Sequence, residues 1–256
     1  MHRFFISPTD ISHQHFATQD RELCHQISKV LKMRVGKHIT LCTNDETEHL
    51  AEWTLVSKSV CEANILQSNQ RPDTSDQRPV HLYVALLKNQ NRWEWMLEKA
   101  TELGAASFTP IITKRTEAQS LRKPERLNRI IQEAAEQSGR TLLPELKPTL
   151  TLEETIKLPG NKYICTIRSQ HPSKDQIPTT NNQILVGPEG GFTEEEITLA
   201  IENDAIPISL GTQTLRTETA AIIAASTLLS SRASPDLSGR RGICQEQNHN
   251  LKQTTQ

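Results

Sequence analysis

The stretch from Gln183 to Glu196, QILVGPEGGFTEEE, predicts a buried strand, a glycine-rich turn and a capped helix. Thr193 and Glu196 have the spacing of a capping box, so the helix should begin directly after the turn. Glycines in the turn Gly187–Gly191 let backbone amides approach a ligand closely, and the N-terminus of a helix favours a negative group. A tight strand-to-helix turn without a ligand explains these residues equally well.

A second predicted strand leads into a helix further along the chain. Ile206–Leu210 has the pattern of a strand, and Gly211 and the LRTETA segment Leu215–Ala220 follow it. Taken alone, this is the start of a helix with Thr217 as its cap and Glu218 near the positive end of the helix dipole. Open α/β sheets bind ligands at loops after the carboxyl ends of neighbouring strands, so the two loops together indicate a site.

Strands and helices alternate throughout the region around these loops. Val80–Leu87 is a nearly unbroken apolar run, as expected of a strand buried on both faces of a parallel sheet. Pro124 suits a first helical position, and Gly104 and Gly139 suit helix ends. The other predicted elements are strands at Phe108–Thr113 and Lys162–Ile167, a capping box at Thr151 and Glu154, and a helix at Thr217–Leu229. The alternation predicts an α/β fold with a mainly parallel sheet.

The residues before this region predict a small β-barrel, because several short strand-like runs are separated by turn-prone segments. The runs are His2–Ser7, His38–Cys42, Ala51–Val56 and Ala63–Gln67, with a helix near Asp20–Leu31. The polar stretch QSNQRPDTSDQRP, from Gln67 to Pro79, is typical of a linker. We therefore expect a β-barrel over residues 1–70, a linker over 71–79, an α/β domain over 80–232 and a disordered tail over 233–256.

Composition restricts the possible functions. The 29 basic and 30 acidic residues give a net charge of −1, so nucleic-acid binding would have to come from a local patch. No apolar run approaches the roughly 20 residues of a membrane span, and no secretory signal is present, which predicts a cytoplasmic protein without membrane contact. The five cysteines are odd in number and form no CxxC pair, which disfavours a metal site and a disulfide framework.

A basic run provides the local patch. The segment from Lys29 to His38 contains Lys29, Lys32, Arg34 and Lys37 and no acidic residue, so it could neutralise several phosphates. A solvent-exposed turn between a helix and a strand explains the same residues. The chain has neither a Gly-x-Ser-x-Gly elbow nor a phosphate-binding or dinucleotide-binding glycine motif, which disfavours a serine hydrolase and common nucleotide-binding enzymes.

Together these motifs resemble the RsmE-type 16S ribosomal RNA uracil-N3 methyltransferases of the SPOUT superfamily. The most specific part is GPEGGFT at Gly187–Thr193 followed at this spacing by LRTETA at Leu215–Ala220. The resemblance is collinear over about residues 1–230. Its other motifs are Arg3-Phe4-Phe5, Val30–Gly36, Lys99–Gly104, Arg115-Thr116 and Glu133–Arg140. The family's glycine-containing basic loop after the first α/β strand reads KNQNR here, at Lys88–Arg92, without a glycine.

The resemblance implies a fold that the spacing of residues does not. It implies a C-terminal SPOUT α/β domain with a deep trefoil knot and a PUA-like N-terminal β-barrel that helps to bind RNA. It further implies a homodimer formed through the knotted domain, with S-adenosylmethionine bound in the knot loops. The implied substrate is one uridine of 16S ribosomal RNA, within the assembled small ribosomal subunit.

The resemblance also implies binding residues. Those for S-adenosylmethionine are Thr166, Ile167, Gly187, Pro188, Glu189, Gly190, Gly191, Leu210, Gly211, Leu215, Arg216, Thr217, Thr219 and Ala220. Those expected to bind RNA are Arg3, Lys29, Lys32, Arg34, Lys37, Lys88 and Arg92.

Methylation of uridine N3 requires loss of the N3 proton, because the neutral imide is a poor nucleophile. The resulting negative charge on O2 and O4 is well stabilised by a guanidinium. Arg216 is the first candidate for this role, with Arg140 and Arg115 as alternatives. Glu218 or Glu189 could accept the proton, or could instead cap a helix or hold a loop closed. Because N3 lies on the Watson–Crick edge, the target must be unpaired or extruded.

Two other functions stay open at this point. A catalytically inactive rRNA-binding assembly factor on the same fold would also carry the basic run, although it would not need intact cofactor loops. A nucleotide-dependent enzyme on a doubly wound sheet would rest on fold analogy alone. Binding of S-adenosylmethionine distinguishes the first of these from an enzyme.

Overall fold

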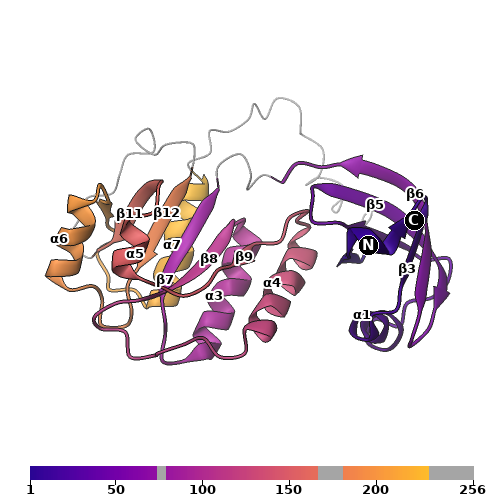
Figure 1. Cartoon of the computed structure of the whole chain (residues 1–256), viewed down its shortest axis with the longest axis horizontal. Coiled ribbons are helices and arrows are strands. Elements are labelled where there is room, and N and C mark those ends of the chain that lie inside the picture. Colours follow the sequence, from indigo (N-terminus) through magenta and orange to yellow (C-terminus); the bar gives the residue numbers. More distant parts are fainter. Residues whose placement is uncertain (74–78, 167–180, 231–256) are drawn as a thin grey trace, which may run out of the picture.

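The computed structural model describes residues 1–73, 79–166 and 181–230. These residues form two sheets that lie side by side, the first from the N-terminal part of the chain and the second flanked by helices (Figure 1). The expected tail over 233–256 and the middle of the expected linker lie outside the described residues. In the described part, no helix combines the length and the apolar composition needed to cross a bilayer.

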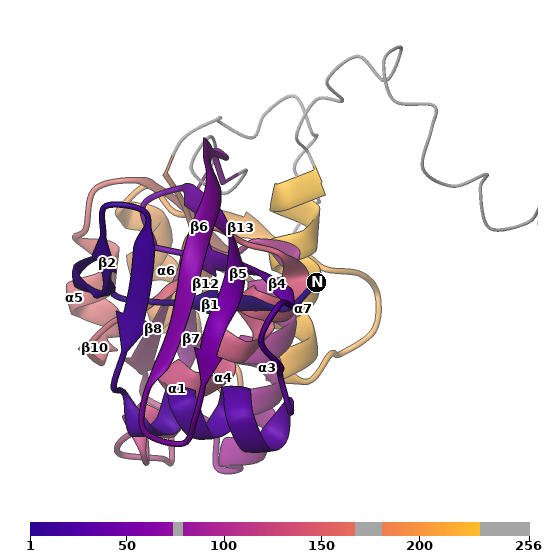
Figure 2. The ribbon, with the colours of Figure 1, turned by 90° about the vertical axis from the view of Figure 1, so that its right-hand side faces the viewer.

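The first sheet has six strands in the order β1-β4-β5-β6-β3-β2 (Figure 2). Its strands are β1 (Arg3–Phe5), β2 (Ile11–Ser12), β3 (His15–Thr18), β4 (His38–Cys42), β5 (Thr47–Val56) and β6 (Cys61–Gln70). β1 pairs with β4 in parallel, and the other neighbours are antiparallel. The runs predicted as strands are all strands, β4 with the predicted bounds, whereas β2 and β3 fall where no strand was predicted.

The core of this first part forms around Trp53, which is fully buried. The rings of Phe4 and Phe16 pack against it with centroid distances of 6.3 and 6.1 Å. The helix expected after Asp20 begins there, because the Asp20 carboxylate accepts a hydrogen bond from the amide of Leu23. It consists of α1 (Arg21–His25) followed by a π-helical turn, η2 (Gln26–Val30).

The second sheet is parallel at every pairing, as predicted. Its strand order is β10-β8-β7-β12-β11-β13, with β9 also paired to β8. The strands are β7 (Val80–Ala85), β8 (Ser107–Ile112), β9 (Glu145–Leu146), β10 (Leu150–Thr151), β11 (Asn161–Cys165), β12 (Asn182–Val186) and β13 (Ile206–Ile208). All strands of this sheet therefore have their carboxyl ends at one edge.

Helices cover both faces of this second sheet, which explains why β7 is apolar at every position except His81. Val80, Leu82 and Val84 point to one face and join a core with the three long helices. Tyr83 and Ala85 point to the other face, into a separate core with the two short helices. The helices are α3 (Gln90–Leu103), α4 (Pro124–Ser138) and α7 (Thr217–Ser230) on the first face, and α5 (Leu152–Ile156) and α6 (Glu194–Glu202) on the second.

The predicted helix boundaries are confirmed. Gly104 and Gly139 end α3 and α4 in the left-handed conformation, with φ of 103° and 76°, where a side chain would be strained. Thr151 and Thr193 form complete capping boxes with the glutamates three residues later. The two capping boxes begin the helices that follow β10 and β12, at the carboxyl edge of the sheet.

The two parts of the chain are in contact through helix α4. Helix α4 packs against β1, and Phe5, Cys42 and Ala135 form a small buried cluster between them. Glu136 on α4 accepts a hydrogen bond from the backbone amide of Phe5 at 3.1 Å. Asp73, which lies in the expected linker, is 7% exposed and belongs to this junction.

Candidate functional site

The two loops singled out in the sequence line a single cavity of about 200 Å³ at the carboxyl edge of the second sheet. Gly187–Gly191 follows β12, and Leu210 and Gly211 come shortly after β13. Thr166 follows β11, the strand that lies between these two. Because the three strands are parallel neighbours, their loops are brought together at this edge.

Most residues that the resemblance assigned to the cofactor line this cavity. They are Thr166, Gly187, Pro188, Glu189, Gly190, Gly191, Leu210, Gly211, Leu215, Thr217 and Ala220. Arg216 and Thr219 are not among the lining residues, and Ile167 lies outside the described residues. Cys165, Val186, Phe192, Gln213 and Thr214 also line the cavity. The sequence analysis missed these five, although Val186 and Phe192 directly flank the glycine-rich turn.

The two loops are joined by one buried hydrogen bond. Thr217 Oγ1 donates to the carbonyl oxygen of Gly187 at 2.9 Å. The hydroxyl predicted to cap α7 therefore connects that helix to the glycine-rich turn. The bond fixes the separation of the two walls of the cavity.

The glycines of these loops have different physical roles. At Gly187 an added Cβ would come within 3.1 Å of the Phe192 ring, so a side chain there would disturb the turn itself. At Gly211, which has φ of +134°, an added Cβ would meet no heavy atom within 4 Å. Gly211 therefore leaves its part of the cavity wall open to a ligand.

Arg115 binds the backbone of the glycine-rich turn. Its Nη1 donates to the carbonyl oxygen of Gly190 at 2.7 Å and lies 3.4 Å from that of Phe192. A Cβ at Gly190 would lie 3.3 Å from Arg115 Cδ, so this glycine allows the arginine side chain to pass close to the backbone. The guanidinium predicted as an alternative catalytic group is thus engaged in shaping the loop.

The loop after β8 is also attached to α6, by the buried Glu196 carboxylate. Its Oε1 accepts from the amide of Lys114 at 2.7 Å, and its Oε2 accepts from the amide of Thr193 at 2.8 Å. The side chain is almost fully buried, so both bonds are shielded from water. Glu196 therefore connects the loop after β8 to the loop after β12.

The two carboxylates considered as proton acceptors have different surroundings. Glu218 is 6% exposed, its Oε1 lies 3.7 Å from Arg92 Nε, and within the described residues its Oε2 has no hydrogen-bond partner. Glu189 is exposed, lines the cavity and accepts a hydrogen bond from the amide of Lys88 at 3.3 Å. Glu189 is therefore the carboxylate that a substrate can reach from the cavity.

Arg216, the first catalytic candidate, is exposed between Leu215 and Thr217, which both line the cavity. No hydrogen bond or ion pair involves its side chain within the described ranges. Its guanidinium is available to a substrate that approaches this edge.

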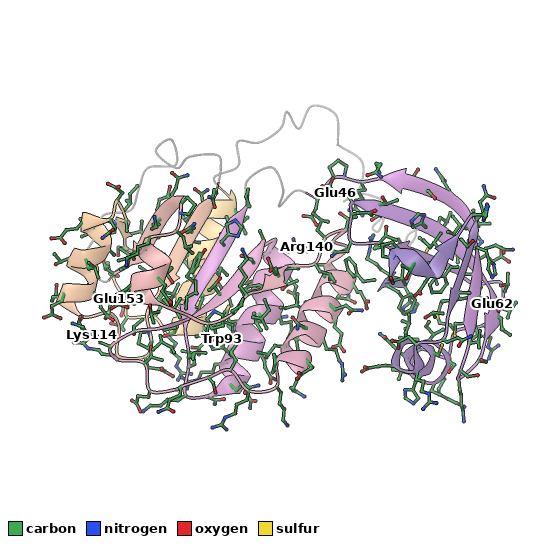
Figure 3. All side chains as sticks on the ribbon, in the orientation of Figure 1. Glu46, Glu62, Trp93, Lys114, Arg140 and Glu153 are labelled. Carbon is green, nitrogen blue, oxygen red and sulfur yellow. The ribbon has the colours of Figure 1, made fainter. Side chains whose placement is uncertain are left out.

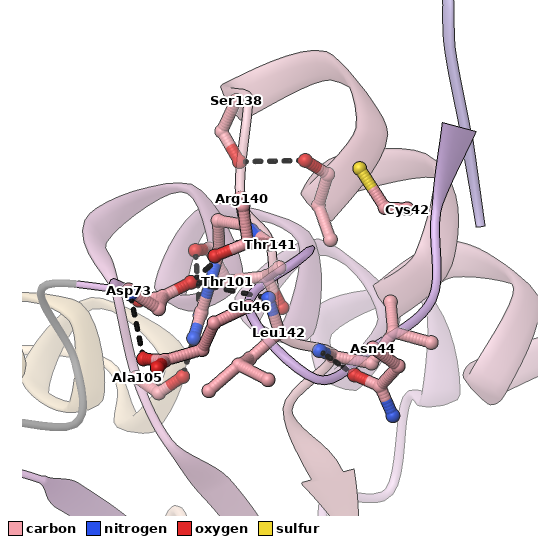
Figure 4. Close-up of polar contacts among 12 residues, drawn as sticks. Cys42, Asn44, Glu46, Asp73, Thr101, Ala105, Ser138, Arg140, Thr141 and Leu142 are labelled. Atoms are coloured by element: carbon pink, nitrogen blue, oxygen red, sulfur yellow. Dashed lines mark hydrogen bonds and ion pairs between the residues drawn. The ribbon is translucent and has the colours of Figure 1, made fainter. Parts of the chain in front are cut away.

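Arg140 lies elsewhere, at the junction between the two sheets and away from Lys114 at the other side of the molecule (Figure 3). Its side chain is 7% exposed; Nη1 donates to the carbonyl oxygen of Ala105 at 2.6 Å, and Nε lies 3.4 Å from Asp73 Oδ2 (Figure 4). Within this chain the contacts of Arg140 are those of a structural residue. The catalytic role named for Arg140 as an alternative to Arg216 stays a prediction.

The residues expected to bind RNA separate into two groups. Lys29, Lys32, Arg34 and Lys37 are all exposed on the first part of the chain. Arg3 is 11% exposed and forms an ion pair with Glu48 at 2.6 Å, so little of its side chain is accessible, and its role in RNA binding stays a prediction. Lys88 and Arg92 lie beside the cavity loops and are paired with Glu117 at 2.7 Å and with Glu218.

The cavity offers neither a nucleophilic thiol nor a metal site. Burial raises the pKa of the Cys165 thiol to about 12, so this residue is neutral near pH 7. Within residues 1–73, 79–166 and 181–230, no cluster of three His, Cys, Asp or Glu side chains could hold a metal ion. The cavity is lined by backbone groups, the Glu189 carboxylate and the polar side chains of Thr166, Gln213, Thr214 and Thr217, and the exposed Arg216 lies beside it.

Comparisons with known proteins agree with this geometry. Residues 74–229 match the family model of the RNA methyltransferase domain. The chain is 29% identical to the ribosomal RNA small subunit methyltransferase E of Bacillus subtilis, over 89% of this chain and 96% of that protein. It is 30% identical to the protein of the same name from Rickettsia conorii, over 78% of this chain and 83% of the other.

A solved structure shows the same arrangement of the chain. The crystal structure of a ribosomal RNA small subunit methyltransferase E from Neisseria gonorrhoeae, bound to S-adenosyl methionine, is similar with a TM-score of 0.80 and 29% identity. The similarity covers 90% of this chain and 97% of that one. It therefore includes both sheets and the cavity loops.

Proposed function

Because this chain belongs to the ribosomal RNA small subunit methyltransferase E family, we propose that it methylates N3 of a uridine in 16S ribosomal RNA. The methyl donor in this proposal is S-adenosylmethionine. The observation that carries the proposal is the meeting of the GPEGG and LRTETA loops on one cavity at the carboxyl edge of a parallel sheet. A protein that only bound RNA would have no use for such a cavity.

The cavity loops suit S-adenosylmethionine. Four glycines line the cavity, and the open space beside one of them, Gly211, leaves room for a ligand close to the chain. Gly187–Gly191, Leu210–Gly211 and Leu215–Ala220 would hold the cofactor, with Thr166 on the third wall. The cofactor supplies an already activated methyl group, so the protein chiefly has to orient it against the acceptor.

The remaining task of the protein is to make N3 nucleophilic. Arg216, exposed beside the cavity, would stabilise the negative charge on O2 and O4 of the uracil. Glu189 is better placed than Glu218 to accept the N3 proton, because Glu189 lines the cavity and is exposed, whereas Glu218 is buried beside Arg92. Arg115 supports the same site through the glycine-rich turn.

RNA would be held by the basic run of the first part. Lys29, Lys32, Arg34 and Lys37 are exposed and free to contact phosphates. The uridine must be unpaired or extruded, which favours the assembled small subunit as substrate over a free nucleoside. The family resemblance further supports a PUA-like barrel, a trefoil knot in the second part, a homodimer formed through that part, and action in the cytoplasm.

The proposal is tested by two measurements on the full chain. Titration calorimetry should detect binding of S-adenosylmethionine. Incubation with unmethylated small ribosomal subunits, followed by digestion and mass spectrometry, should detect 3-methyluridine. Absence of cofactor binding would support the inactive assembly factor instead, and methylation at a different atom would overturn the assignment of N3.

A further inference from the structure

A second and larger cavity lies next to the site described above. Its volume is about 700 Å³, against about 200 Å³ for the cavity of the two loops. One wall is the segment from Leu86 to Trp93, which connects β7 to α3, and the other is Glu117–Arg122, which precedes α4. The KNQNR loop noted in the sequence provides part of the first wall, whereas no sequence motif marked the second wall.

Two bridges hold the walls of this cavity apart at a fixed separation. Lys88 Nζ lies 2.7 Å from Glu117 Oε1, an ion pair that raises the pKa of Lys88. Gln90 Nε2 donates to the carbonyl oxygen of Arg122 at 2.8 Å. The space between the walls is thus a built feature of the fold.

The lining offers polar groups above an apolar floor. Leu86, Leu87 and Trp93 are almost fully buried and form the floor. The side-chain Oδ1 of Asn89 caps α3 by accepting from the backbone amide of Asn91, which leaves the side-chain Nδ2 of this lining residue available as a donor. The other polar side chains of the lining are Gln119, Ser120 and Arg122, which within the described part of the chain make no hydrogen bond.

A hydrogen bond connects the larger cavity to the glycine-rich turn of the smaller one. Lys88 lines the larger cavity, Glu189 lines the smaller one, and the Lys88 amide donates to Glu189 Oε1 at 3.3 Å. A molecule in the larger cavity would therefore lie beside the carboxylate that faces the cofactor loops.

We propose that the larger cavity receives the extruded target nucleotide, an inference that rests on the proposed function. Amide side chains pair with the edge of a uracil, and an apolar floor accommodates its ring. The lining carries two cations, Lys88 and Arg122, and one anion, Glu117, which suits a phosphodiester group. Asn89 and Gln119 are thereby assigned as the residues that recognise the base.

With the base in this position, every bond broken in the methyl transfer is matched by a bond formed. With the N3 edge toward Glu189, the N3–H bond breaks and the proton passes to the Glu189 carboxylate. The electron pair left on N3 forms the new bond to the methyl carbon. The bond between that carbon and sulfur breaks, and its electrons remain on the sulfur of the cofactor product.

Three variants test the inference. Ser120→Trp fills the cavity, Gln119→Ala removes one amide, and Asn89→Asp keeps the cap of α3 while replacing the amide donor by an anion. Single-turnover methylation of small subunits should fall on the order of tenfold for Gln119→Ala, the effect of one lost hydrogen bond to a neutral group, and further for the other two. Affinity for S-adenosylmethionine should stay within twofold of the wild type, because none of the three residues lines the smaller cavity.

Matched controls are Thr198→Trp, on the exposed side of α6, and Gln67→Ala, on an exposed position of β6, which should both methylate normally. If all three cavity variants methylate at the wild-type rate, the inference is overturned while the proposed function stands. If they lose cofactor affinity in parallel with rate, the cavity merely supports the cofactor loops and the inference is again overturned. If the wild type neither binds the cofactor nor forms 3-methyluridine, the proposed function is overturned, and the inference that rests on it is overturned with it.

Discussion

Arg140 Nε lies 3.4 Å from Asp73 Oδ2, and both side chains are more than nine-tenths buried. Asp73 follows the last strand of the first sheet, and Arg140 follows α4 of the second part. The Asp73 carboxylate also lies 3.3 Å from the backbone amides of Thr141 and Leu142, so the pair anchors the end of β6 to the second part. This anchor therefore helps to set how the first part of the chain lies relative to the second.

Arg140→Ala should therefore lower both stability and RNA methylation. The variant leaves Asp73 buried without its cation, and breaking a buried pair in this way costs about 3–5 kcal/mol. Urea unfolding should report this loss. Calorimetry should show unchanged affinity for S-adenosylmethionine, because Arg140 does not line the cavity.

Arg126→Ala is the matched control for Arg140→Ala. Arg126 makes two hydrogen bonds of 2.9 Å to Glu94, but its side chain is 60% exposed. Water screens such a pair, so the expected loss is about 0–1 kcal/mol. Equal losses in the two variants would show that burial of the Arg140 pair is unimportant.

Arg216→Ala should reduce the single-turnover methylation rate by roughly 10²–10³, the range seen when one donor to a developing oxyanion is lost. Stability should not change, because Arg216 is exposed and its side chain has no partner in the described residues. Arg216→Lys should recover little activity, since an ammonium cannot span two acceptors as a guanidinium does. A normal rate at saturating cofactor would exclude a catalytic role.

Gly211→Ala should weaken binding of S-adenosylmethionine by at least about tenfold, because the new methyl group enters open space in the cavity wall. Gly104→Ala is its control: both glycines have positive φ and no neighbour within 4 Å, but only Gly211 lines the cavity. Calorimetry on the two proteins separates loss of ligand space from backbone strain. Comparable affinity in both would remove Gly211 from the binding site.

Gly190→Val should also abolish cofactor binding, but through a different contact. The added side chain would first meet Arg115, whose Cδ would lie 3.3 Å from the new Cβ. Displacement of Arg115 would release the glycine-rich turn that it holds. A titration with S-adenosylmethionine that matched the wild type would show that the turn does not form the site.

Replacing Lys32, Arg34 and Lys37 together with alanine should weaken RNA binding and flatten its salt dependence. Each lost phosphate contact reduces the slope of log affinity against log salt by about 0.7–0.9, so the total reduction should be about 2–3. Filter-binding titrations across salt concentrations measure the slope, with the exposed Lys58→Ala as control. An unchanged slope would mean that these residues do not touch phosphate.

The sequence predicted those elements whose signals lie within a short stretch of chain, and it missed those that depend on pairing with distant strands. The apolar run Val80–Leu87, the capping boxes at Thr151 and Thr193, and the glycine helix ends predicted their elements because these signals act within one or two turns of chain. The strands β2 and β3 carried no such signal; they have only two and four residues, and they exist through pairing with each other and with β6. The cavity loops were also local, since each is a contiguous motif at a strand end.

The tertiary structure alone decided which contacts Arg140 and Arg115 make. Arg140 and Arg115 were equivalent candidates in the sequence, but Arg140 meets Asp73 at a separation of 67 residues and Arg115 meets Gly190 at a separation of 75. The larger cavity likewise forms between two loops that no motif connects. A guanidinium binds whichever acceptors the folded chain brings within hydrogen-bonding distance, and sequence spacing does not encode that distance.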